Sequence, residues 1–143
     1  MRTLIATLIA LMLFATTPVA AEDFEDGVVA YNAGDYQKAL RLWEPLAEQG
    51  NKFVQSILGK MHLNGWGVPQ DYAKAVHWWT KAAKQGYAEA QFLVGRGYAK
   101  GEGVPQDNVR AYARFSIAAT QGVDGGKKGK EIAAKFMTIV APS

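Results

Sequence analysis

The sequence repeats itself with a period of 36 residues. Shifting residues 51–86 onto 87–122 superimposes four glycines and two copies of the stretch VPQD, at Val68–Asp71 and Val104–Asp107. A first copy, residues 22–50, keeps the aspartate, alanines and a tryptophan but has a shorter turn. Periods of this length are typical of stacked supersecondary units, none of which can bury its apolar face alone. The repeat therefore predicts an array of such units.

Each copy has the pattern of two helices joined by a turn. Apolar residues at helical spacing cover residues 52–63, and the turn Gly65–Gln70 holds two glycines and a proline, which interrupt a helix. Asp71 then stands where an N-cap belongs, and Gly86 follows the second helix as a left-handed stop. Each copy is therefore expected to be a helix-turn-helix unit.

Small residues in the first helices and a large aromatic residue in the second helix predict close packing between the helices. Gly59 and Gly95 lie inside the first helices, where a glycine costs about 1 kcal/mol relative to alanine. We expect close contact with a neighbouring helix to offset that cost. Trp79, four residues after Ala75 on the second helix, is expected in the core.

These residues together form a known repeat pattern. The pattern L-G-x-x-Y-x-x-G-x-G-V-x-x-D-x-x-K-A-x-x-W-x-x-A-A-x-x-G resembles the Sel1-like repeat, a relative of the tetratricopeptide repeat (TPR). The copy in residues 51–86 carries it at Leu58-Gly59, Gly65, Gly67-Val68, Asp71, Lys74-Ala75, Trp78, Ala82-Ala83 and Gly86. His62 stands in place of the usual tyrosine, and Arg114 replaces the tryptophan in the next copy.

The resemblance covers residues 23–122 and implies a fold and a general role. The implied fold is all-α: a right-handed α-solenoid of helix-turn-helix repeats, here three Sel1-like copies over 22–50, 51–86 and 87–122. Members of this family serve mostly as adaptors for protein complexes, often in bacterial envelopes.

Residues 1–21 have the features of a signal peptide. Arg2 precedes a largely apolar run, Leu4–Ala15, and small residues follow it. We expect cleavage between Ala21 and Glu22 and a periplasmic or secreted protein with no stable membrane span. The run is short for a bilayer core of about 30 Å, but an uncleaved anchor stays an alternative.

Residues 123–143 are expected to close the array as a C-terminal capping helix and tail. After a break at Asp124–Gly126, a helix over Lys127–Ile139 is predicted, with lysines on its outer face. The residues expected to face inward are Ile132, Phe136 and Ile139 or Val140.

Composition argues against several classes of function. The net charge is +3, of which Arg2 supplies one, so we expect no nucleic-acid partner. The chain has no cysteine, and its two histidines, His62 and His77, lack the spacing of metal ligands. No serine lies in a strained nucleophile turn, and the glycine-rich turns lack the ending of a P-loop. We therefore predict no catalytic residue, no metal site and no cofactor.

The chain is instead expected to bind another protein or a peptide. The first helices of the copies are expected to line the concave side and to present a partner-binding surface of Tyr31, Gln55, Lys60, Gln91, Phe92, Arg96 and Lys100. Trp66, between two glycines of a turn, is a possible loop contact, or it folds back over Trp78 or Tyr72.

These features predict an exported protein–protein interaction module that acts as an envelope adaptor or assembly scaffold. One alternative is a peptidoglycan- or carbohydrate-binding module, which would need Trp66, Trp78 and Tyr98 exposed in one plane. Another is a cell-wall hydrolase, which would need His62 or His77 hydrogen-bonded to a carboxylate in a cleft.

The two ends of the chain differ in charge. The acidic start, Glu22–Asp26, could dock a basic partner or simply form the first helical turn. The basic stretch Lys127–Lys130 could contact an anionic lipid or polymer, or serve solubility. The oligomeric state stays open.

Overall fold

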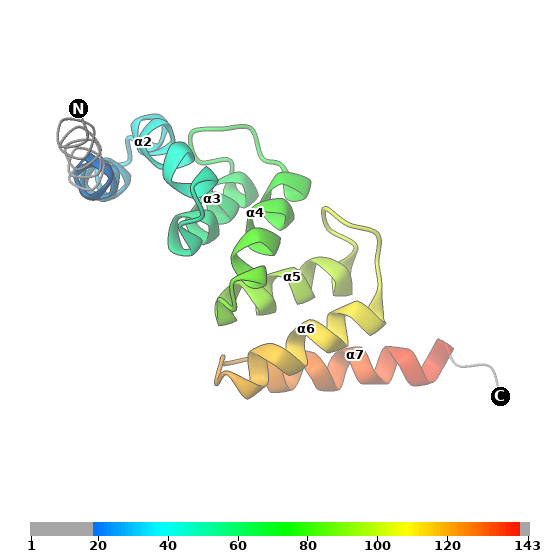
Figure 1. Cartoon of the computed structure of the whole chain (residues 1–143). Coiled ribbons are helices and arrows are strands. Elements are labelled where there is room, and N and C mark those ends of the chain that lie inside the picture. The colour runs from blue at the N-terminus through cyan, green and yellow to red at the C-terminus, as the bar shows by residue number, and fades with distance from the viewer. Residues whose placement is uncertain (1–18, 141–143) are drawn as a thin grey trace, which may run out of the picture.

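The computed structural model describes residues 19–140, and the side chains of residues 19–135. All regular structure in this part of the chain is helical: a helix over residues 19–32 precedes α2 (Tyr36–Glu48), α3 (Lys52–Asn64), α4 (Tyr72–Lys84), α5 (Ala88–Lys100), α6 (Asn108–Thr120) and α7 (Gly126–Val140). Figure 1 shows the helices following one another along an elongated stack, with the first helix and α7 at opposite ends. The predicted all-α solenoid is confirmed.

The expected signal peptide, residues 1–21, lies almost wholly outside the described residues. Its last three residues, 19–21, belong to the first helix. No helix in the described range has the length and apolar character needed to cross a membrane.

The second helix of each repeat begins at an aspartate cap, as the sequence predicts. The Asp71 carboxylate accepts a hydrogen bond from the Lys74 backbone N–H at 2.9 Å. Asp35 and Asp107 cap α2 and α6 in the same way, accepting from the backbone N–H groups of Lys38 and Arg110. Each carboxylate thus partners one of the N–H groups that a helix start leaves free.

The glycines of the long turns end one helix and contact the preceding repeat. Gly65 closes α3 in the left-handed region, with φ at 69°. Two residues on, Gly67 has φ at 73°, and a Cβ there would lie 2.9 Å from the Tyr36 backbone at the start of α2. Gly103 lies against the backbone of Tyr72 in the same way. Glycine is therefore required at this position both for backbone conformation and for contact between repeats.

Aromatic rings of the second helices pack directly on glycines of the first helices. The indole of Trp79 lies against Gly59, and its Nε1 donates a hydrogen bond to the Ser56 carbonyl oxygen at 3.1 Å. Trp79 is only 4% exposed. A Cβ on Gly59 would overlap this ring, so the expected compensation for a glycine inside a helix is this close contact.

The same contact occurs in the other two repeats. Trp43 packs on Gly27 of the first helix and donates to the Phe24 carbonyl oxygen at 3.2 Å. Phe115 packs on Gly95, where an added Cβ would lie 2.9 Å from the ring. These three rings are all buried and form the centres of successive parts of the core.

The C-terminal helix α7 packs on α6 through a different face from the one expected. Gly126 lies against the Ala119 backbone, Gly129 against the Phe115 ring, and Ala133 is 1% exposed. The prediction that Ile132 faces inward is wrong, since Ile132 is 45% exposed. The large Phe115 ring leaves room only for small residues on the facing side of α7. Ile132 therefore lies at the edge of the contact between α6 and α7. The side chains of Phe136, Ile139 and Val140 lie outside the described residues.

We expect Trp79→Ala to lower the free energy of unfolding by about 3–5 kcal/mol, because it leaves a large cavity beside Gly59. Trp79→Phe should cost clearly less, since Phe115 occupies the equivalent position in the next repeat. The exposed His77 on the same helix provides a control, and His77→Ala should change stability little. Chemical denaturation followed by circular dichroism measures all three. Equal stability of Trp79→Ala and the parent would contradict this packing.

Candidate functional site

The seven residues expected to bind a partner fall into different environments. Gln55 and Gln91 are buried, and Tyr31 is partly buried in an aromatic cluster. Lys60 forms an ion pair with Glu89, with Nζ and Oε1 2.8 Å apart. The remaining three, all on α5, are the half-buried Phe92 and the exposed Arg96 and Lys100.

The expectation that Gln55 and Gln91 face outward is wrong. Gln91 is 5% exposed; its Nε2 donates to the Ala83 carbonyl oxygen at 2.8 Å, and its Oε1 accepts from Arg114 Nη1 at 2.9 Å. Gln55 donates likewise to the Ala47 carbonyl oxygen and accepts from Gln85. Each of these side chains therefore links its own repeat to the preceding one.

The sequence held a signal for this burial. Gln91 precedes Gly95 by four residues, as Gln55 precedes Gly59, so each glutamine shares a helix face with a glycine that packs on an aromatic ring. Arg114, which replaces the tryptophan of the repeat pattern, supplies the guanidinium that Gln91 binds.

We expect Gln91→Ala to lower the free energy of unfolding by about 1–3 kcal/mol, because the Ala83 carbonyl oxygen and the Arg114 guanidinium both lose a partner. Arg96→Ala, at an exposed position on the same helix, should change it by less than about 0.5 kcal/mol. Urea denaturation of the two variants makes the comparison. Equal effects would place Gln91 at the surface.

Trp66 packs onto the preceding repeat. Its ring stacks on Tyr36, with centroids 5.4 Å apart and planes at 11°, and meets the Tyr31 ring edge-on. Its ring-stacking partners are therefore the tyrosines of the first copy, and it packs against the buried cluster that also includes Trp78. Stacked rings of this kind fasten the long turn to the start of α2.

The aromatic platform needed for sugar stacking is not formed. Of its three residues, Trp78 is 8% exposed, Trp66 lies flat against Tyr36, and Tyr98 is partly buried with Arg110 over its ring. Rings that are already covered offer no shared exposed plane to a saccharide.

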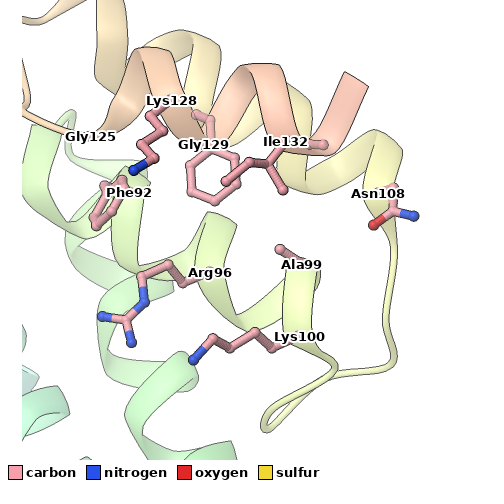
Figure 2. A pocket seen from close by; sticks show the side chains of 11 residues that line it. Phe92, Arg96, Ala99, Lys100, Asn108, Gly125, Lys128, Gly129 and Ile132 are labelled. Atoms are coloured by element: carbon pink, nitrogen blue, oxygen red, sulfur yellow. The ribbon is translucent and has the colours of Figure 1, made fainter. Parts of the chain in front are cut away.

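A pocket of about 370 Å³ opens between α5 and α7 (Figure 2). We call it the α5–α7 pocket. Its apolar wall consists of Phe92, Ala99, Phe115, Ile132 and Ala133, with Gly125 and Gly129. Gly129 packs directly on the Phe115 ring and Gly125 lies near the Phe92 ring, so both glycines contribute backbone to this wall. Ile132, turned aside by the packing of Gly129, completes the wall.

Three cations border the α5–α7 pocket, and none of the described residues that line it carries a carboxylate. Arg96 and Lys100 follow Phe92 at steps of four residues, so they form one stripe along α5. Lys128 comes from α7 on the other side (Figure 2). Lys100 has a carboxylate nearby, Glu102 at 3.9 Å, but both groups are about half exposed, so the pair is weak.

Sequence reasoning found one side of this pocket and missed the other. Phe92, Arg96 and Lys100 were expected to bind a partner, and the fold brings them together. Lys128 and Ile132 were assigned to a solvated face and to the core, respectively. Both residues lie at the pocket because α7 is rotated about its axis so that Gly129 contacts Phe115. A sequence pattern does not reveal that rotation.

Neither histidine is paired for acid–base chemistry. His62 is 6% exposed, and its Nδ1 has no hydrogen-bond partner among the described residues. His77 is exposed with its ring edge-on to Trp78. In the described part of the chain, no three His, Cys, Asp or Glu side chains gather where they could hold a metal ion.

Burial lowers the pKa of His62 below its usual value of 6.5, and nearby Lys74 lowers it further, while Asp71 and Glu44 act in the opposite sense. As the pH falls, the unfolded chain therefore takes up this proton first. The stability that depends on neutral His62 is present above pH 6.5 and is lost progressively below it.

We therefore expect His62→Gln to reduce the loss of stability between about pH 7.5 and about pH 5, compared with the parent. The exposed His77→Gln serves as the matched control and should keep the parent's profile. Thermal melting over this pH range provides the measurement. Identical profiles for His62→Gln and the parent would be inconsistent with a buried neutral His62.

The repeat pattern and the paired helices agree with a comparison against protein families. The Sel1 repeat model matches residues 25–51, 54–87 and 88–123. The chain belongs to the Sel1 repeat family. Sel1 repeats mediate protein–protein interaction, and their fold serves as an interaction scaffold that is not typically enzymatic. No match to this Sel1 chain was found among curated proteins.

Solved structures share the fold of this Sel1 chain. A Sel1 repeat protein from Oxalobacter formigenes is 32% identical with a TM-score of 0.73, over 87% of this chain and 97% of that one. A protective antigen present in uropathogenic Escherichia coli strains, which displays an SLR fold, is also 32% identical with a TM-score of 0.73. That match covers 81% of this chain, which spans only 26% of the antigen.

A third structure supports the fold alone. Helicobacter pylori cysteine rich protein B is 23% identical with a TM-score of 0.61, over 64% of this chain and 69% of that one.

Proposed function

We propose that this Sel1 protein is an exported adaptor or assembly scaffold of the bacterial envelope, which binds protein partners at the α5–α7 pocket. The observation that carries this proposal is an apolar pocket of about 370 Å³ bordered by Arg96, Lys100 and Lys128. An apolar wall suits a buried side chain of a partner, and the cations suit carboxylates around that side chain.

Two further features support the location and the type of partner. Residues 1–21 have the charged start, apolar run and small-residue end of a signal peptide, which favours export to the periplasm. Sel1 repeats mediate protein–protein interaction, which favours a protein over a saccharide or nucleic acid as the partner.

The binding prediction is tested by affinity capture from the envelope of the native bacterium. The full chain with a C-terminal tag should retain a defined protein partner, and Phe92→Ala with Arg96→Glu should reduce capture about tenfold or more, since both the apolar contact and the charge are lost. The control is Lys84→Glu, which reverses an exposed charge on α4 away from the pocket. Equal capture by all three proteins would rule out the pocket as the binding site.

The export prediction is tested on the same preparation. The protein should be recovered from the periplasmic fraction with Glu22 at its N-terminus. Recovery from the cytoplasm with residues 1–21 still attached would contradict export.

A further inference from the structure

The outer face of the first helix carries an unpartnered acidic and apolar surface. Glu22, Glu25 and Asp26 are exposed, and Val29 is 68% exposed. Glu25 and Asp26 precede Val29 by four and three residues, so all three side chains share one face of the helix. The opposite face holds Gly27 and Ala30, which pack into the core around Trp43. Among residues 19–135, whose side chains the structure describes, none pairs with these carboxylates, so the acidic face is available to another molecule.

This surface complements the α5–α7 pocket in both charge and polarity. On the first helix, an exposed apolar side chain is flanked by carboxylates. In the pocket, an apolar hollow is flanked by Arg96, Lys100 and Lys128. The lengths also agree. The seven helical steps from Glu22 to Val29 span about 10 Å, and the eight steps from Phe92 to Lys100 span about 12 Å.

The two surfaces cannot meet within one molecule. Figure 1 shows the first helix and α7 at opposite ends of the stack, separated by the repeats between them. Any contact between the acidic face and the α5–α7 pocket must therefore join two copies of the chain.

We propose that copies of this protein associate head to tail, with the first helix of one copy docked in the α5–α7 pocket of the next. Val29 enters the hollow beside Phe92 and Ile132, and Glu25 and Asp26 face the cations at its border. Because each copy has one free helix and one free pocket, such contacts build rings or open chains. This inference rests on the proposed function, since it names an occupant for the same pocket.

Head-to-tail association would extend a short repeat array. Three repeats form a short array, and joined copies would form a longer one, in which the pocket at the open end of each chain of copies stays available to another partner. A contact held partly by exposed charges should also weaken with added salt, because the Debye length falls from about 10 Å at 0.1 M to about 3 Å at 1 M and the attraction is screened. Self-association would then depend on both protein concentration and ionic strength.

The test is sedimentation velocity of the purified protein, obtained by expressing the full chain, over a range of concentrations at low and high salt. We expect species larger than a monomer to grow with concentration and to diminish at high salt. Glu25→Lys with Asp26→Lys, and separately Arg96→Glu with Lys128→Glu, should each weaken self-association at least tenfold, because like charges then face each other.

Mixing these two variants provides the decisive measurement. The helix variant has a basic first helix, which complements the acidic pocket of the pocket variant. The pocket variant keeps the native acidic helix, which complements the native cationic pocket of the helix variant. The mixture should therefore form species larger than a monomer again, in which the two variants alternate. Failure of the mixture to recover would overturn the proposal.

The apolar part of the contact has a matched control within the chain. Val29→Ser should weaken self-association, whereas Val109→Ser, at a valine on α6 that is 67% exposed, should not. Both positions are exposed, so circular dichroism should show both variants folded. Equal behaviour of the two variants would exclude Val29 from the contact.

The outcomes separate this inference from the proposed function. A protein that stays monomeric at every concentration, yet captures a foreign partner through the pocket, overturns head-to-tail association and leaves the adaptor function standing. A monomer that captures nothing through the pocket overturns both.

Discussion

The architecture depends on one repeated contact, in which an aromatic ring of a second helix packs on a glycine of the preceding first helix. Gly59 lets the Trp79 indole approach the α3 backbone, where its Nε1 reaches the Ser56 carbonyl oxygen. The contact sets the distance between the helices and fills the space between them with one large buried group. A side chain in place of the glycine would force the helices apart, so the glycine is a requirement of packing despite its cost to the helix.

The same constraint shapes the surface that we assign to binding. Phe115 contacts glycines on both sides, Gly95 on α5 and Gly129 on α7. Because α7 must present small residues to this ring, its larger Ile132 lies at the edge of the interface. The resulting α5–α7 pocket is apolar, and Arg96, Lys100 and Lys128 lie at its border. The proposed binding pocket is thus a consequence of how the stack is closed at its C-terminal end.

The sequence predicted local features well and the orientation of helix faces less well. Asp71 and Gly65 were correctly assigned to a helix start and a helix end, because capping depends on a few neighbouring backbone groups. Gln91 was assigned to the surface because the first helices were expected to line the concave side of the solenoid with their outward positions. Its burial depends on the Ala83 carbonyl oxygen and the Arg114 guanidinium, two groups from other helices. Trp66 likewise found its partners, Tyr31 and Tyr36, in the preceding repeat.

The sequence by itself determined the repeat, the helix boundaries and the family, because periodicity, caps and turn glycines are local and recur every 36 residues. The tertiary structure alone decided which face of each helix is buried and where the free surfaces lie. That outcome depends on the rotation of each helix against its neighbours, which is set by the fit of rings such as Phe115 onto glycines distant in sequence. For the same reason, only the folded chain places its acidic helix and its cationic pocket at opposite ends.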